Sequence, residues 1–120
     1  MDESNRINPT RLDYNGPVKL YTIDHIPGAE LEALGMVEGS VVQSKHIGKD
    51  LMAGFKTLVG GEIKGYTEML TEARGIATAR MARQAEALGA DAVVNVRYAS
   101  SAIMDGAAEV LAYGTAVRIK

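Results

Sequence analysis

The two histidines are the residues of this chain best suited to metal chemistry, because imidazole nitrogen is a common metal ligand. They are His25 and His46, and the chain has no cysteine. A zinc site needs three or four converging ligands, and the spacings His-x-x-x-His and Glu-x-x-His are both absent. We therefore expect no metal within one chain and interpret both histidines as surface or hydrogen-bonded residues. The alternative is a shared site, in which His46 or Asp50 of several subunits converges in a ring.

A glycine-rich segment has the spacing of a phosphate-binding loop. Four residues separate Gly60 from Gly65, and Tyr66 and Thr67 follow. Such a loop requires lysine where Tyr66 stands, so hydrolysis of a nucleotide by this segment is excluded. Glycines mark tight turns more often than phosphate loops. We interpret the segment first as a turn between two helices.

The same segment also supports a hypothesis about a small anion. A helix that begins near Gly65 leaves its first amide groups without intrahelical partners, and their positive end favours an anion. The candidate residues are Gly60, Gly61, Lys64, Gly65 and Tyr66. In the competing interpretation Glu62 or water caps these amides, and the turn is purely structural.

Catalysis has weaker support. No Gly-x-Ser-x-Gly elbow occurs, and a chain without cysteine has no thiol nucleophile. Carboxylates such as Glu62, Asp91, Asp105 and Glu109 could be paired between subunits, but any chain of this size offers such sets. We expect no enzyme and no cofactor, and we keep an enzyme that uses inter-subunit carboxylates as a distant alternative.

Composition narrows the class of protein. A chain of 120 residues is one domain. The net charge of −2 and the lack of a basic run argue against a nucleic-acid partner. No apolar stretch is long enough to span a membrane, and the N-terminus lacks the pattern of a signal peptide. The absence of cysteine fits a reducing compartment, and we expect a cytoplasmic protein.

The elements that must position these residues follow from the spacing of apolar side chains. Residues 1–18 show no periodicity and are expected to form a mobile extension, or one ordered only by docking on the body. A short strand over 19–22 is closed by a turn at Pro27-Gly28. A longer strand covers 34–45, in which Gly39 suggests a bulge or a close contact. A short helix is predicted over 51–59 and a long helix over 65–88, with Gly89 as its end.

The long helix has small residues on a second face, where a solvated helix would carry lysine and glutamate. Gly75, Ala79 and Ala82 share that face. A glycine inside a helix costs about 1 kcal/mol relative to alanine. Close packing against another subunit and simple tolerance of alanine are equally good explanations of this face.

Two strands close the chain, joined by a loop over 100–107 that contains the turn signal Asp105-Gly106. In the first strand, the alternation places Ala92, Val94, Val96 and Tyr98 on one face and Asp91, Asn95 and Arg97 on the other. In the second, bulky residues line one face and small residues line the other: Leu111, Tyr113, Thr115, Val117 and Ile119 against Val110, Ala112, Gly114 and Ala116. A helix can cover the small face, but the chain has too little helix for both. We therefore predict that the bulky face packs on a second copy, with Leu111, Tyr113 and Val117 at the interface.

Four motifs in order resemble the YbjQ-like family. They are Lys45-His46-Ile47-Gly48-Lys49-Asp50, then Gly60 to Thr67, then Leu88 to Val94, and Gly106 to Val117. The resemblance covers residues 19–120. It implies small α/β subunits with a dodecin-like fold that form pentameric rings, and a family label of "putative heavy-metal-binding" domain with no assigned reaction.

Taken together, these observations predict an α+β, two-layer sandwich in which a small, mostly antiparallel sheet is covered by one long and one short helix. Residues 1–18 are an extension, and residues 19–120 are the domain. The expected partner is the chain itself in a ring, with no nucleic acid and no membrane. Two functions stay open: a non-catalytic binding or scaffold protein with a ligand site between subunits, and a heavy-metal-binding protein.

Overall fold

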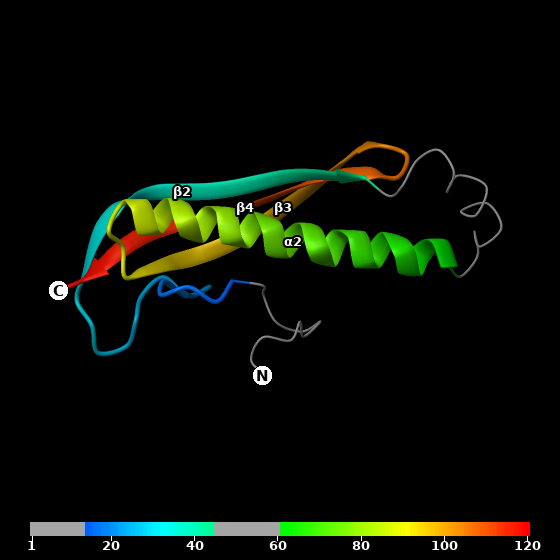
Figure 1. Cartoon of the computed structure of the whole chain (residues 1–120). Coiled ribbons are helices and arrows are strands. Elements are labelled where there is room, and N and C mark those ends of the chain that lie inside the picture. The colour runs from blue at the N-terminus through cyan, green and yellow to red at the C-terminus, as the bar shows by residue number, and fades with distance from the viewer. Residues whose placement is uncertain (1–13, 45–60) are drawn as a thin grey trace, which may run out of the picture.

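A computed structural model describes residues 14–44 and 61–120, and the side chains of the latter range from residue 65 onward. Four strands form one sheet: β1 (Lys19–Leu20), β2 (Leu31–Ser44), β3 (Ala92–Met104) and β4 (Ala107–Ile119). Their order is β1-β3-β4-β2, with β1 parallel to β3 and the other pairs antiparallel. One helix, α2 (Gly61–Ala87), lies across one face of this sheet (Figure 1). The predicted α+β fold is confirmed, and the predicted helix over 51–59 lies outside the described residues.

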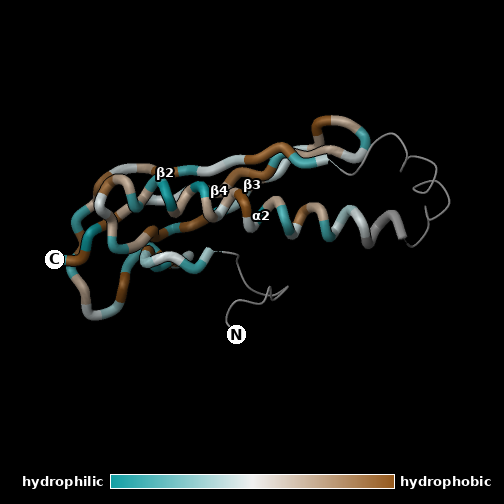
Figure 2. Tube along the Cα trace, viewed as in Figure 1, coloured by the Kyte–Doolittle hydropathy of each residue, from teal (hydrophilic) through white to brown (hydrophobic). Residues whose placement is uncertain are grey.

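The helix α2 forms because apolar side chains recur at helical spacing. Met69, Ala73, Ala77, Met81 and Ala85 are all buried against the sheet, and Figure 2 shows hydrophobic and hydrophilic residues alternating along the helix as it crosses the strands. Gly89 ends it in the left-handed conformation, with φ of 80°. The amide of Ala90 then donates to the carbonyl of Ala85 at 3.1 Å. The predicted end is confirmed, but the helix already includes Gly61, so the predicted start near Gly65 is wrong.

Small residues set the distance between the helix and the sheet. A Cβ at Gly39 would lie 2.3 Å from the carbonyl oxygen of Ala77 and 2.4 Å from the amide nitrogen of Met81. Of the two predictions for Gly39, the close contact is therefore confirmed. The bulge of β2 lies between Ala33 and Gly35 instead. The buried cluster is Val18, Val37, Ala73, Ala77, Met81, Ala85, Val93, Val96, Val110, Ala112 and Ala116.

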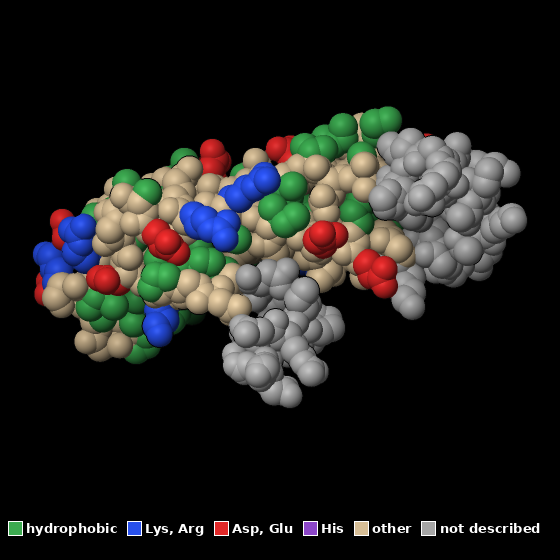
Figure 3. Space-filling view, in the orientation of Figure 1, with side chains coloured by type: hydrophobic (Ala, Val, Ile, Leu, Met, Phe, Trp, Pro, Cys, Tyr) green, Lys and Arg blue, Asp and Glu red, His purple; other side chains and the backbone are tan. Residues whose placement is uncertain are grey.

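The strand boundaries are wider than those predicted. β2 begins at Leu31, and β3 continues to Met104, so the hairpin to β4 turns at only Asp105 and Gly106. The turn at Pro27-Gly28 is confirmed: Gly28 has φ of 79°, and the amide of Ala29 donates to the carbonyl of Ile26 at 3.0 Å. Ile103 and Met104 are exposed at the tip of the hairpin. Figure 3 shows hydrophobic side chains gathered near that end of the molecule.

A second bulge changes which residues of β3 face the helix. Asn95 has φ of 58°, and the pairing with β4 shifts between Val94 and Arg97. Val96 therefore lies in the cluster under α2, whereas Val94 lies in a separate cluster on the other side. The predicted alternation, with Val94 and Val96 on one face, is wrong because the extra residue reverses the orientation of everything after it.

The two faces of β4 are as predicted. Val110, Ala112, Gly114 and Ala116 are buried on the side of the helix. On the opposite side Leu111 and Thr115 are half-buried, and Tyr113 is 37% exposed. We call this second side, which α2 does not cover, the open face of the sheet.

One end of the open face is covered by the chain itself. Tyr21, Ile26 and Leu31 pack there against Ala92, Val94 and Val117. Val117 is only 3% exposed. The prediction of Val117 as an interface residue is therefore corrected, because the segment that connects β1 to β2 already occupies its surroundings.

Candidate functional site

The predicted anion site is not formed as expected. The amides of Gly65 and Tyr66 lie inside α2, where each donates to the carbonyl four residues earlier. Gly61 and Lys64 belong to the first described turn of the same helix, and Gly60 lies outside the described residues. Since the helix begins earlier than predicted, Gly65 and Tyr66 have no amide to offer a ligand. The predicted helix start, on which the anion hypothesis was based, is therefore wrong, whereas an anion site at this segment stays a prediction.

The predicted metal ligands do not come together in the described part of the chain. His46 and Asp50 lie outside it. His25 is exposed, and its Nδ1 lies 2.9 Å from Oδ1 of Asp24; this hydrogen bond lowers the pKa of the Asp24 carboxyl. Within residues 14–44 and 61–120, no three His, Asp or Glu side chains form a group that could hold an ion. The described residues therefore offer no group with the three or four ligands that a zinc site needs.

The small residues of α2 are covered within a single chain. Gly75 and Ala82 are buried and Ala79 is half-buried, so Gly75 and Ala82 are not available to a second subunit. The segment that precedes β1 docks nearby on the helix: the hydroxyl of Tyr14 donates to the carboxylate of Glu86 and accepts from the amide of Val18. Burial and the neighbouring Glu86 carboxylate raise the pKa of the Tyr14 hydroxyl.

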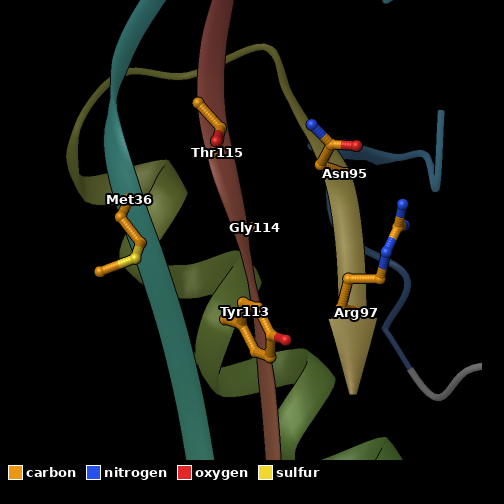
Figure 4. A pocket seen from close by; sticks show the side chains of 6 residues that line it. All are labelled: Met36, Asn95, Arg97, Tyr113, Gly114 and Thr115. Carbon is orange, nitrogen blue, oxygen red and sulfur yellow. The ribbon is translucent and has the colours of Figure 1, made fainter. Parts of the chain in front are cut away.

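The open face carries a hollow of about 240 Å³. Its lining comes from three strands: Met36 from β2, Asn95 and Arg97 from β3, and Tyr113, Gly114 and Thr115 from β4. Figure 4 shows Met36 on one side and Asn95 and Arg97 on the other, with Gly114 on the strand between them. The register explains this grouping, because Thr115 pairs with both Met36 and Val94, and Tyr113 pairs with Arg97.

The bulge of β3 builds this hollow. It places both Asn95 and Arg97 on the open face together with Val94, whereas regular alternation from Val94 would turn both toward the helix. It also leaves Gly114 opposite the extra residue. A Cβ at Gly114 would lie 2.7 Å from Cγ1 of Val93 and 2.9 Å from the carbonyl oxygen of Val94. Glycine is therefore required at this position for β4 to pack against the bulge of β3.

Arg97 is the charged group of the hollow. Its Nη1 donates to the carbonyl oxygen of Thr22 at 2.9 Å and to that of Val96 at 3.0 Å. Two main-chain acceptors thus orient the guanidinium, and among the described residues no carboxylate forms an ion pair with it. Met36, Asn95 and Arg97 are not among the site residues predicted from the sequence. The available signal was Asn95, since asparagine is rare inside strands and tolerates a positive φ.

Comparison with known proteins places the fold and the family. A family model described as YbjQ_1, "Putative heavy-metal-binding", matches residues 18–120. The chain belongs to this family. It is 61% identical over 100 residues to a UPF0145 protein of Clostridium novyi, covering 83% of this chain and 97% of the relative. It is 64% identical over 100 residues to one of Thermotoga maritima, covering 82% and 94%.

A solved structure shows the same fold at much lower identity. It is a protein of unknown function of the DUF74 family from Pediococcus pentosaceus, with a TM-score of 0.57 at 16% identity. The match covers 86% of this chain and 98% of that one. The membership predicted from the four motifs is confirmed, and no reaction is attached to the names of these YbjQ-like relatives. No helix among the described residues is long and apolar enough to cross a membrane.

Proposed function

We propose that this YbjQ-like protein is a non-catalytic binding or scaffold protein of the cytoplasm that acts as a homo-oligomer. The open face of the sheet is the observation that carries the proposal. One helix covers the other face, and the segment between β1 and β2 covers one end of this one. The rest of the open face has no cover among the described elements.

The uncovered part of this face carries exposed apolar side chains. Met36 is 76% exposed and Val42 is 62% exposed. On the neighbouring strand β4, Leu111 and Tyr113 lie between the positions that pair with Met36 and Val42, and both are partly exposed. Soluble monomers rarely leave a contiguous apolar patch of several hundred square ångströms in water, and larger patches mark interaction sites. Burying such side chains contributes roughly 25 cal/mol per Å² of apolar area. A packing partner is therefore expected on this face.

A second copy of the chain is the partner that we propose. The resemblance to the YbjQ-like family implies a pentameric ring, and a ring in which each subunit covers its neighbour's open face leaves none exposed. A ligand site between subunits fits this arrangement, because the hollow beside Arg97 lies on the same face. Mass spectrometry of small molecules that co-purify with the ring would identify such a ligand.

Light scattering behind size exclusion tests the assembly. We expect about five times the mass of the chain, and we expect Leu111→Asp to yield smaller species, because a buried unpaired charge costs several kcal/mol. Leu88→Asp is the matched control, since Leu88 is 45% exposed at the end of α2, away from the open face. A monodisperse monomer of the unaltered chain at micromolar concentration would overturn the proposal.

Heavy-metal binding is the second candidate, favoured by the description of the family model. Among the described residues no cluster of His, Asp or Glu could hold an ion. A complete site would need ligands from elsewhere, for which His46 and Asp50 of several subunits are the candidates. Elemental analysis of protein purified without chelator separates this function from the first.

A further inference from the structure

We propose that the hollow of the open face is a binding site for a small oxyanion, the carboxylate or phosphate group of a compact ligand. The proposal rests on the proposed binding role and adds the class of ligand. It is carried by an oriented guanidinium that has no carboxylate partner among the described residues, and by hydrogen-bond donors that line the same hollow. The hollow lies where the backbone of β3 departs from regular geometry.

The lining of the hollow is rich in donors and has no acid. Arg97 supplies a guanidinium, Asn95 an amide, and Tyr113 and Thr115 supply hydroxyls. Of the six lining residues none is Asp or Glu. Glu38 of β2 and Arg97 of β3 pair with Tyr113 of β4 from opposite sides. Tyr113 therefore stands between this acid and the guanidinium. An oxyanion would accept charge-assisted hydrogen bonds here, which are about twice as strong as neutral ones.

Arg97 is prepared for this role by its own contacts. Both of its hydrogen bonds to described residues use Nη1 and go to main-chain carbonyls, which leave its charge uncompensated. Its remaining N–H groups are not engaged by the described residues. Arginine held in this way presents a planar fork that matches a carboxylate or phosphate group.

The bulge at Asn95 is the independent observation. Asn95 is the non-glycine residue with a positive φ among the described residues, and its amide nitrogen donates to the carbonyl oxygen of Ile23 at 2.9 Å. Bulges re-aim side chains and occur often beside functional sites. Here the bulge aligns Asn95 with Arg97 on one side of Gly114, while Met36 on the other side offers an apolar wall for the body of the ligand (Figure 4).

Amide correlation spectra of the nitrogen-labelled full chain test the site. The probes are sodium phosphate and sodium butyrate, each titrated at constant ionic strength against chloride. We expect saturable shifts of the Gly114 amide and the Asn95 side-chain amide with at least one probe. A response to phosphate alone identifies a phosphate-bearing ligand, and a response to butyrate alone identifies a carboxylate with an apolar body.

Three variants make the test specific. Arg97→Gln should weaken binding of the responding probe about tenfold or more, because it removes a charge-assisted contact. Asn95→Gly should also weaken it while the fold persists, since glycine adopts a positive φ readily. Arg118→Gln, a matched change at an exposed arginine that pairs with Glu32 at 3.6 Å, should leave binding unchanged.

Several results would overturn the proposal: no saturable shift with either probe, equal weakening by Arg118→Gln, or full binding in both Arg97→Gln and Asn95→Gly. If Arg97→Gln alters the assembled mass and no probe shifts the hollow, Arg97 is an interface residue instead. Light scattering of the same samples distinguishes failure of the oxyanion site from failure of the proposed assembly. If the chain forms a ring but binds neither probe, only the oxyanion site is overturned.

Discussion

Two glycines allow close approach of neighbouring elements, one between the helix and the sheet and one between two strands. Gly39 lies where the backbone of α2 meets β2, and Gly114 lies where the bulge of β3 meets β4. In both places the nearest atoms include main chain, which cannot move aside as a flexible side chain can. The core is otherwise built from alanine and valine, so it has few large side chains that could rearrange to accept extra volume.

Replacing Gly39 by alanine should therefore destabilise the protein by about 3 kcal/mol or more. Overpacking costs typically 1–3 kcal/mol, and the new Cβ would meet two main-chain atoms of α2. Chemical unfolding in urea measures the change. Ser40→Ala is the control on the neighbouring exposed position and should stay within about 0.5 kcal/mol of the unaltered chain. A Gly39→Ala protein of normal stability would show that the helix can retreat from the strand at little cost.

A buried hydroxyl pair links α2 to β3. The hydroxyl of the fully buried Thr78 donates to the carbonyl oxygen of Arg74 at 2.7 Å. Its Oγ1 also lies 2.7 Å from the hydroxyl of Tyr98. Thr78→Val keeps the shape but removes both contacts, and we expect a loss of about 1–2 kcal/mol in the free energy of unfolding. In a double-mutant cycle with Tyr98→Phe, the double variant should lose less than the sum of the single losses. Additive losses would mean that the two hydroxyls act independently.

At the scale of the elements, α2 protects the outer edge of β2. Two of its side chains reach main-chain groups of that strand: Oε1 of Gln84 accepts from the amide of Glu38 at 2.9 Å, and Nη1 of Arg80 donates to the carbonyl oxygen of Ser40 at 2.7 Å. Exposed edge strands pair with other chains and lead to aggregation. Because these two groups are occupied, β2 is less available for extension of the sheet by a second chain, which agrees with the proposed assembly through the open face.

Removing both protecting side chains should expose that edge. We expect the double variant Arg80→Ala, Gln84→Ala to lose about 1 kcal/mol per hydrogen bond and to aggregate faster on mild heating, with a rise in the fluorescence of a dye specific for β-aggregates. Arg83→Ala removes an arginine from the same helix at an exposed position without a contact to β2 among the described residues. If Arg83→Ala aggregates as fast as the double variant, the cause is the loss of positive charge rather than exposure of the strand edge.

At the scale of the molecule, the chain has one described helix for a sheet of four strands. The helix lies over β2 and β4, and the open face keeps its apolar side chains and its hollow. The proposed assembly and the proposed ligand site therefore share one surface. The same reasoning makes the stoichiometry of any metal informative, since ligands would have to be shared.

Metal analysis should find no tightly bound transition metal in a ratio of one per chain. The chain has two histidines and no cysteine, and a stable zinc site requires three or four ligands. Plasma emission after extensive dialysis provides the measurement. One zinc or copper per chain would contradict this prediction. One ion per ring would indicate a shared axial site, and His46→Ala would then be the first variant to analyse.

The sequence by itself determined the features that depend on neighbours along the chain. The helical spacing from Met69 to Ala85 predicted α2 and its buried face, Gly89 predicted where it ends, and the alternation in β4 predicted which side meets the helix. These patterns are local, because each residue's orientation follows from a fixed period of 3.6 or 2 residues. The four sequence motifs likewise identified the family.

Only the tertiary structure decided the candidate site. The bulge at Asn95 reverses the orientation of Val96 relative to Val94, and it is accommodated because Gly114 stands opposite on another strand. Val117 is covered by the segment that connects β1 to β2, which is distant in the sequence. The alternation of residues in β4 therefore could not reveal that Val117 is buried. The hollow joins Met36 to Arg97 across three strands. Its residues meet through cross-strand register, which no periodicity within one segment encodes.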